Sequence, residues 1–212
     1  MLIKAFTFNP VGENTYIIWD EETKEAAIID AGMSNNRENE TVSQFVAQEN
    51  LKLKFALQTH MHFDHVWGLS YIKETYGLKP LCHIADESIY ADVPEMTSMF
   101  RLSMAWSLPA IERHIDEGET IQLGNTTIKV LHTPGHTPGG LSYYIPSANI
   151  IFTGDTLFQG SIGRTDLPGG NLSDEIESIK KKIITLPAET TIYSGHGPKS
   201  NVGWELRNNP YL

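Results

Sequence analysis

Three histidines and an aspartate lie within six consecutive positions of the segment THMHFDHVWG, residues 59–68. The chain has eight histidines among 212 residues, so nearly half of them lie here. His60 and His62 are two positions apart, so on an extended backbone their imidazoles point the same way and can bind one metal ion. Asp64 and His65 follow on the turn into a predicted helix and can reach a second ion.

Three more ligand-type residues each follow an apolar segment that is predicted to form a strand. His136 follows IKVLHTPG, Asp155 follows NIIFTG and His196 follows TTIYSG. Ligands on loops at strand ends converge outside a sheet that fixes their positions. Imidazole and carboxylate groups without a thiolate suit zinc, iron or manganese in a catalytic site. One histidine alone is more often a surface or core side chain, but this arrangement predicts a metal site.

Four motifs, THMHFDH, TPGHTPGG, TGDTLF and SGHGP, resemble the successive metal motifs of the metallo-β-lactamase superfamily and span residues 59–198. SIGRTDLPGG and the ending GHGPKSNVGWELRNNPYL resemble more narrowly the short, single-domain glyoxalase II-like (hydroxyacylglutathione hydrolase-like) enzymes. The resemblance implies an α/β fold, an αββα sandwich of two mixed sheets with helices on the outer faces. It also implies one domain over residues 1–212, without the C-terminal helical domain of larger glyoxalase II enzymes.

The resemblance also assigns ligands to two divalent metal ions, with zinc expected before iron or manganese. The residues that would bind one ion each are His60, His62 and His136 for the first ion and Asp64, His65 and His196 for the second. Asp155 would bridge the two ions together with a water molecule, because a carboxylate has two oxygens to share. Water on two metals is acidic enough to be hydroxide near neutral pH, and this hydroxide is the expected nucleophile. Asp64 and Asp155 are the expected catalytic carboxylates.

The implied activity is hydrolysis of a thioester, S-lactoylglutathione or a similar 2-hydroxyacyl thioester. Glyoxalase II binds glutathione partly through a lysine on the loop after GDTLF and through nearby tyrosines. Arg164 stands where that lysine falls and would bind a carboxylate of the thiol portion. Asp166 and Pro198 stand at two of the tyrosine positions. The alternative role of Arg164 is an ion pair with Asp166 that shapes the loop.

Other members of the superfamily remain as alternatives. A mononuclear iron persulfide dioxygenase shares GRTD and the histidine pattern, but binds one iron through the equivalents of His62, His136 and Asp155. A metallo-hydrolase of another ester, lactone or phosphodiester, such as an RNA-processing nuclease, and a non-enzymatic member are further alternatives. The net charge of −10, from 16 basic and 26 acidic residues, argues against a nucleic-acid partner. The complete ligand set argues against an inactive protein.

The remaining histidines and the single cysteine have weaker predictions. His132 either supports the metal site from behind or has a structural role at a strand end, and His83 and His114 are given no function. Cys82 is predicted to be a buried strand thiol rather than a nucleophile. One cysteine, with neither a signal peptide nor a long apolar segment, predicts a cytoplasmic protein that acts on a small molecule and not at a membrane.

Hydrophobic periodicity predicts the elements that position these residues. Strands are expected at residues 2–8, 14–20 and 25–30, as an antiparallel meander, and then at 51–59, 78–84, 120–123, 126–131, 141–145, 149–153 and 191–194. Helices are expected within residues 33–50, 65–77, 85–91 and 171–186, the last with Ser173 as its N-cap. Residues 92–115 form either a loop or broken helix at a pocket mouth, or a packed helical insertion. With the loop 160–170, they would line the acyl and thiol pockets.

Overall fold

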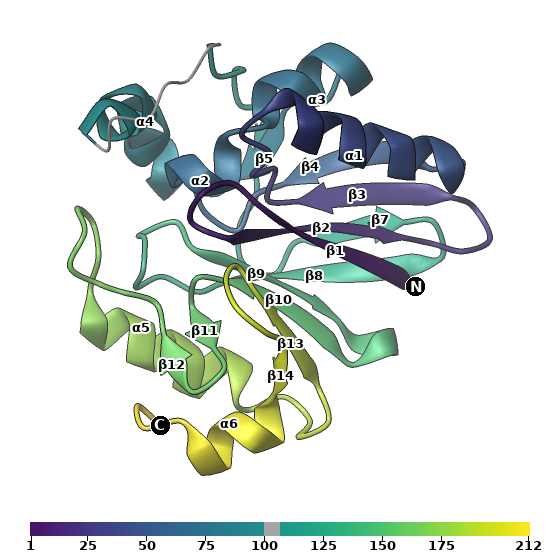
Figure 1. Ribbon diagram of the computed structural model, residues 1–212. Helices are drawn as coiled ribbons and strands as arrows, with labels where there is room; N and C mark the ends of the chain where they lie inside the picture. Colours follow the sequence, from purple (N-terminus) through teal and green to yellow (C-terminus); the bar gives the residue numbers. More distant parts are fainter. Residues whose placement is uncertain (100–106) are drawn as a thin grey trace.

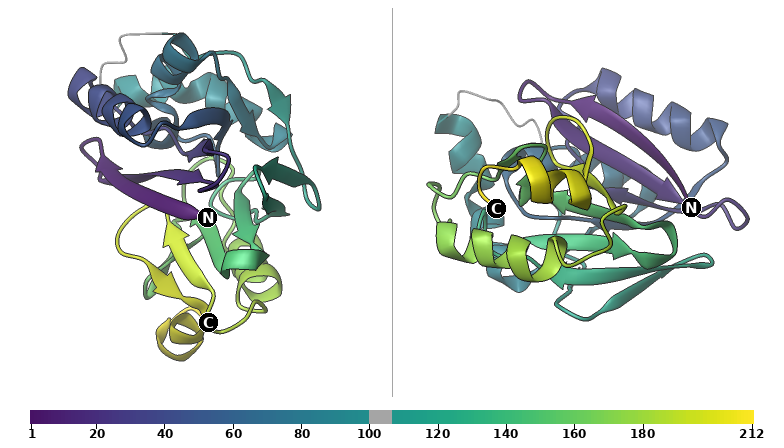
Figure 2. Two further views of the ribbon diagram at one scale, coloured as in Figure 1. Left: turned by 90° about the vertical axis from the view of Figure 1, so that its right-hand side faces the viewer. Right: turned by 90° about the horizontal axis from the view of Figure 1, so that it is seen from below.

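The protein, described by a computed structural model over residues 1–99 and 107–212, consists of two facing six-stranded sheets with helices on the outer faces (Figure 1). The first sheet has the order β1-β2-β3-β4-β5-β6 and the second β14-β13-β10-β9-β8-β7. The two further views in Figure 2 show the same layers from the side and from below. The predicted α/β sandwich is therefore confirmed.

The first sheet combines an antiparallel half and a parallel half. β1, β2 and β3 form the predicted antiparallel meander, and β3, β4, β5 and β6 pair in parallel. The strands are β1 (Leu2–Phe8), β2 (Glu13–Trp19), β3 (Glu25–Ile29), β4 (Lys52–Leu57), β5 (Pro80–Cys82) and β6 (Arg113–His114). The helices of this half are α1 (Asn36–Gln48), α2 (Phe63–Val66), α3 (Leu69–Tyr76), the 3-10 turn η1 (Ile84–Asp86) and α4 (Glu87–Met99).

The second sheet is mainly antiparallel, with one parallel pair between β10 and β13. Its strands are β7 (Thr120–Leu123), β8 (Thr126–His132), β9 (Leu141–Ile145), β10 (Ile150–Gly154), β13 (Thr191–Ser194) and β14 (Ser200–Asn201). A hairpin of β11 (Leu157–Phe158) and β12 (Ser161–Ile162) follows β10. The other elements are η2 (Pro146–Ala148), α5 (Leu172–Ser178), the π-helix η3 (Ile179–Ile183) and α6 (Val202–Asn208).

Alternation along the central strands divides the core into layers. Tyr16 and Ile18 of β2 pack between the two sheets, whereas Ile17 and Trp19 face the helices of the first half. This pattern follows from the period of two of a strand, whose successive side chains point to opposite faces. Because both faces of β2 are buried, its sequence is apolar throughout its second half. On the outer face of the second sheet, Ile151 packs against α5 and η3.

Three predicted helices differ from the observed ones. The helix expected at residues 65–77 is broken at Gly68, whose amide donates to the Ala31 carbonyl, and its second part ends at the left-handed Gly77. The helix expected at 85–91 continues through Pro94 as α4. Ser173 is not the N-cap of α5, since the Asn171 side chain accepts from the amides of residues 173 and 174.

The predicted pocket-mouth segment, residues 92–115, lies partly outside the described residues, which omit 100–106. Within the described part, residues 92–99 belong to α4 and 113–114 form β6. Both alternatives therefore hold in part, because α4 is a helix and its side chains also line the cavity described below. Among the described residues, no helix has the length and apolar character needed to cross a membrane.

Candidate metal centre

The structure brings the three predicted first-ion ligands together at one end of the sandwich. His60 and His62 lie on the loop after β4, and His136 lies on the loop after β8. His62 Nδ1 is 2.9 Å from His136 Nε2, and one ring nitrogen of each of the three residues lies within 4.8 Å of the others. Burial and the neighbouring histidines lower the pKa values of His60 and His62, that of His62 to about 3. These imidazoles are therefore neutral, as metal ligands must be.

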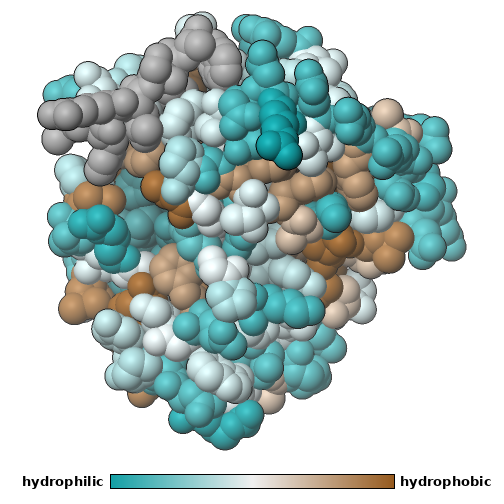
Figure 3. Space-filling model, in the orientation of Figure 1, coloured by the Kyte–Doolittle hydropathy of each residue, from teal (hydrophilic) through white to brown (hydrophobic). Residues whose placement is uncertain are grey.

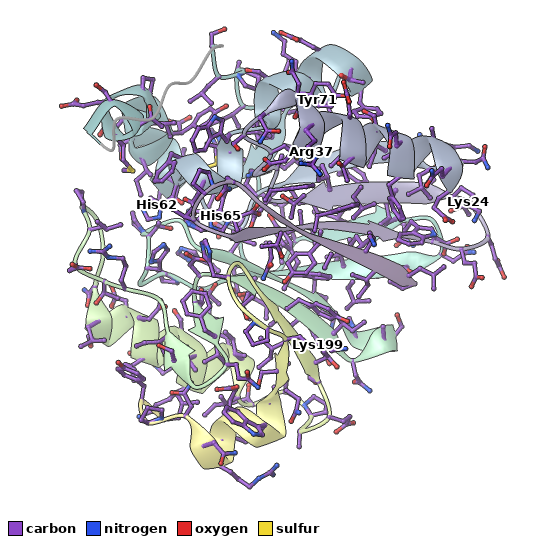
Figure 4. The ribbon with its side chains drawn as sticks, viewed as in Figure 1. Lys24, Arg37, His62, His65, Tyr71 and Lys199 are labelled. Carbon is purple, nitrogen blue, oxygen red and sulfur yellow. The ribbon has the colours of Figure 1, made fainter. Side chains whose placement is uncertain are left out.

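The three predicted second-ion ligands form an adjoining group. Asp64 and His65 lie on α2, directly after the first pair, and His196 follows β13. Asp64 Oδ2 is 3.1 Å from His196 Nε2 and 3.6 Å from His65 Nε2. Figure 4 shows His62 and His65 at the same end of the molecule, between its two halves.

Asp155 lies between the two groups, at the end of β10. Its Oδ1 is 3.4 Å from His65 Nε2, and its Oδ2 is 3.6 Å from both His136 Nε2 and His196 Nε2. Burial alone would raise the pKa of Asp155, but the nearby charge of His65, together with those of His136 and His196, outweighs it, so the pKa is lowered. The carboxylate thus faces both groups in its charged form, which is the position predicted for a shared ligand.

Three ligand-type atoms in this centre are buried without a hydrogen-bond partner among the described residues. They are His60 Nε2, His65 Nε2 and Asp155 Oδ1. Buried polar atoms are usually paired, and unpaired ones need an explanation. All three belong to predicted metal ligands, and His65 Nε2 lies 3.4 Å from Asp155 Oδ1, so bound cations would account for them together. The donor set of five imidazoles and two carboxylates fits two divalent ions such as zinc.

In four of the five histidines, the ring nitrogen Nδ1 lies beside a neighbouring acceptor. His65 Nδ1 is 3.0 Å from Asp30 Oδ2, and His136 Nδ1 donates to the Arg164 carbonyl at 2.7 Å. His196 Nδ1 donates to a carbonyl of the β1–β2 loop. With Nδ1 donating in each case, Nε2 is the atom that would bind a metal ion. His60 follows the same rule through the Thr59 hydroxyl, 3.0 Å away. Despite their burial, the buried carboxylates beside them raise the pKa values of His65 and His196, so a metal ion would displace a proton from these two rings.

Three residues that support the ligands were missed by the sequence analysis. Asp30 accepts from His65, from the Thr59 amide and from the Thr59 hydroxyl. Glu175 of α5 accepts from the His136 amide at 2.8 Å, and burial raises its pKa. Asp86 joins the two histidine loops. An aspartate directly after the apolar strand β3 was a signal that could have found Asp30, whereas Glu175 lies in an ordinary helical pattern.

A cavity of about 940 Å³ opens onto the centre. His62, Asp64, His136, Asp155 and His196 reach its wall, whereas His60 and His65 lie behind them. Its apolar lining includes Phe63, Trp67, Ile89 and Met96 on the side of the first sheet and Phe158, Ile162, Leu167 and Pro168 on the other. In the space-filling view, apolar residues lie around the hollow on the side of α4 and α5 (Figure 3).

Arg164 lines this cavity, as predicted, but it is paired. Its Nε and Nη2 donate to the two carboxylate oxygens of Asp166 at 2.7 and 2.8 Å. Both side chains are more than half exposed, so the pair contributes little stability. The loop-shaping ion pair is therefore present, and a substrate carboxylate would either replace Asp166 or bind the guanidinium N–H groups that do not donate to Asp166. Five residues of the loop 160–170 line the cavity: Ser161, Ile162, Arg164, Leu167 and Pro168.

The remaining histidines lie away from the centre. The rings of His83 and His132 stack at 4.1 Å and 14°, so their in-plane lone pairs cannot converge on one ion. His132 Nε2 donates to the Pro138 carbonyl at 2.9 Å, which supports the loop that carries His136. His114 is partly exposed and lies 2.9 Å from a glutamate at the start of α4. Cys82 is a buried thiol in β5, as predicted, and burial raises its pKa to about 12.

Two facing mixed sheets that bring histidine and aspartate side chains to one edge define a class of metal-dependent enzymes. A profile of the metallo-beta-lactamase superfamily matches residues 8–196. The hydroxyacylglutathione hydrolase GloC of Haemophilus influenzae is 37% identical over 219 aligned residues, which cover 100% of this chain and 98% of GloC. The chain belongs to the metallo-beta-lactamase superfamily, as its motifs predicted, and members of this superfamily are generally hydrolases.

Two solved structures share the whole fold. TTHA1623, crystallised in a di-iron-bound form, has a TM-score of 0.88 and 33% identity, covering 99% of this chain and all of that chain. ETHE1 from Myxococcus xanthus has a TM-score of 0.81 and 27% identity, covering 99% of this chain and 84% of that chain. The superfamily fold and the clustered donors together imply divalent metal ions in this protein.

Proposed function

We propose that the protein is a binuclear metallo-hydrolase of thioesters, with S-lactoylglutathione or a similar 2-hydroxyacyl thioester as substrate. The observation that carries this proposal is the position of Asp155, whose two oxygens lie 3.4 Å and 3.6 Å from histidines of the two ligand groups. A single carboxylate between two sets of three ligands matches a two-cation site. The similarity to GloC supports the acyl-thioester class.

In such a reaction, one set of residues would bind the metal ions and another would bind the substrate. Two divalent ions, when bound, would supply Lewis acidity and an acidified water molecule. Asp64 and Asp155 would offset part of their charge, and the five histidines would fix their spacing. The cavity walls, with Trp67 on one side and Phe158 on the other, would hold the acyl and thiol parts and limit the access of bulk water. A thiolate leaves readily, so the reaction needs no strong general acid from the chain.

Zinc is the proposed metal, with iron and manganese as alternatives. The ligand set contains five imidazole and two carboxylate donors, which all three metals accept. The di-iron form of TTHA1623 gives iron a specific precedent on the same fold. The buried Cys82 and the single-cysteine composition support a reducing, cytoplasmic compartment. A small-molecule partner is proposed, rather than nucleic acid or membrane.

A mononuclear iron persulfide dioxygenase is the second candidate function, and the whole-chain likeness to ETHE1 favours it. It would use His62, His136 and Asp155, which do lie together. It would leave His60 Nε2 and His65 Nε2 unused, although both atoms are buried and have no hydrogen-bond partner among the described residues. The two-cation hydrolase uses all of these atoms, so it accounts for the site better.

Metal analysis combined with two activity assays tests the proposal. Protein purified without added metal is analysed for ions per chain, and zinc-loaded protein is assayed for thiol release from S-lactoylglutathione. We expect two ions per chain and thiol release that stops after chelation and returns with zinc. One iron per chain, with oxygen uptake on glutathione persulfide and no thiol release, would replace this proposal with the dioxygenase.

A further inference from the structure

The Asp86 carboxylate is fully buried and joins two loops that are far apart in the sequence. Its Oδ2 accepts from the Met61 amide at 3.2 Å and from the Thr137 hydroxyl at 2.9 Å. Its Oδ1 accepts from the Gly139 amide at 2.6 Å. Met61 lies between two predicted ligands of the first ion, and Thr137 directly follows the third.

The two loops start from different sheets, so backbone pairing within a sheet does not set the distance between them. The loop with His60 and His62 follows β4 of the first sheet, and the loop with His136 follows β8 of the second. Yet His62 Nδ1 and His136 Nε2 lie only 2.9 Å apart. A side chain that accepts hydrogen bonds from both loops, next to their ligands, therefore helps to fix this distance.

The surrounding chain is built to admit this carboxylate. A Cβ atom on Gly139 would lie 2.6 Å from Asp86 Oδ1 and 2.8 Å from the Asp86 amide nitrogen, so a side chain there would displace it. Asp86 accepts three hydrogen bonds, which together offset much of the cost of burying its charge. It also ends the turn η1 and leads directly into α4, the helix that carries cavity residues Ile89 and Met96.

We propose that Asp86 is a positioning residue that sets the spacing of the first cation's ligands by holding the two histidine loops together. The inference rests on the two-cation site of the proposed function. It assigns the effect to one site: without Asp86, Met61 and Thr137 lose the side chain that joins them beside the first-ion ligands, while the backbone hydrogen bond from the Leu141 amide to the Thr59 carbonyl remains. His65 and His196 are held by other acceptors, Asp30 and the Gly12 carbonyl, and the Asn9 side chain donates to the backbone carbonyl of Asp64.

Zinc titration against a chromophoric chelator, with histidine ring spectra by NMR to assign each binding step, tests this role. In Asp86→Asn, an amide NH₂ would face at least one of the three donors, so we expect the first-site dissociation constant to rise roughly 10–100-fold. Thr137→Val removes a single hydrogen bond to Asp86 and should give a smaller rise at the same site. The second-site constant should stay near its wild-type value in both variants.

Thr133→Val is the matched control, since its hydroxyl lies on the same loop and is buried, but it contacts Ser142 at 3.0 Å instead of Asp86. It should lower stability in urea without changing the first-site constant. Unchanged first-site affinity in Asp86→Asn and Thr137→Val, or equal weakening of both sites in step with lost stability, would overturn the inference. If wild-type protein itself binds fewer than two zinc ions, the proposed function fails instead.

Discussion

At Gly154, adding one carbon atom should disturb the loop that carries His60. It has a φ of +50°, and a Cβ there would lie 2.2 Å from Thr59 Oγ1 and 2.5 Å from Thr59 Cβ. Thr59 cannot rotate away freely, because its hydroxyl donates to Asp30 and lies beside His60 Nδ1. An alanine in the left-handed backbone conformation lowers the free energy of unfolding by about 1 kcal/mol, and the displacement of Thr59 by the new Cβ lowers it by about 1–3 kcal/mol. Gly154→Ala should therefore lower the free energy of unfolding by about 2–4 kcal/mol.

Gly118→Ala separates the two parts of this cost. Gly118 also has a positive φ, of +80°, but a Cβ there would meet no atom of the described residues within 4 Å. Its loss should be about 1 kcal/mol, the conformational part alone. Urea unfolding of both variants with excess chelator measures the difference, and zinc affinity should fall for Gly154→Ala only. Equal losses of stability would refute the contact between Gly154 and Thr59 as the cause.

Three further outcomes are expected. Asp155→Ala should lower zinc affinity more than about 100-fold, a larger loss than that from removing a residue that only supports a ligand. Elemental analysis should then find at most one ion per chain. Two retained ions would contradict the shared-ligand role. If Arg164 binds a substrate carboxylate, Arg164→Ala should raise KM at constant kcat while Asp166→Ala does not, since it frees the guanidinium; parallel losses of stability in both would favour loop shaping. In metal-free protein His62 has a pKa of about 3, so between pH 6 and 4.5 the unfolded chain binds more protons. His62 alone should then lower the free energy of unfolding by up to about 1.4 kcal/mol per unit decrease in pH, as measured by urea titration, and His60, whose pKa is also lowered, adds to this slope. A flat profile in that window would contradict a neutral, buried His62.

The sequence predicted the ligand groups well because their signal is local. His60, His62, Asp64 and His65 are adjacent, and His136 follows a clear apolar strand, so residue type and spacing were enough. The same holds for the β1–β3 meander, where short turns force neighbouring strands to pair. The structure brings all of the predicted ligands together, while their binding of metal stays a prediction.

The supporting residues could not be predicted in the same way, because their roles depend on contacts across the two sheets. Asp86 and Glu175 look like ordinary polar residues in helical segments, and only the packed structure shows their buried oxygens on the His136 loop. The α5 cap was missed for a local reason: Asn171 and Ser173 are both good caps, and propensity alone does not choose between them. The sequence left two roles open for Arg164, binding a substrate carboxylate or pairing with Asp166, and only the structure shows that the ion pair forms.

The ligands of each proposed ion come from both sheets, and this arrangement would tie the lifetime of a metal-binding protein to the supply of its metal. An ion bound only by the folded chain, at a free concentration 1,000 times its dissociation constant, adds about 4.1 kcal/mol to the free energy of unfolding. Without metal, Asp64 and Asp155 remain buried together, and the charged groups that pair with them within the described residues are histidines. A newly made chain in a zinc-starved cell would then open more often between its two halves. Its degradation by cellular proteases would follow metal availability, so abundance as well as activity would report the zinc status of the cell.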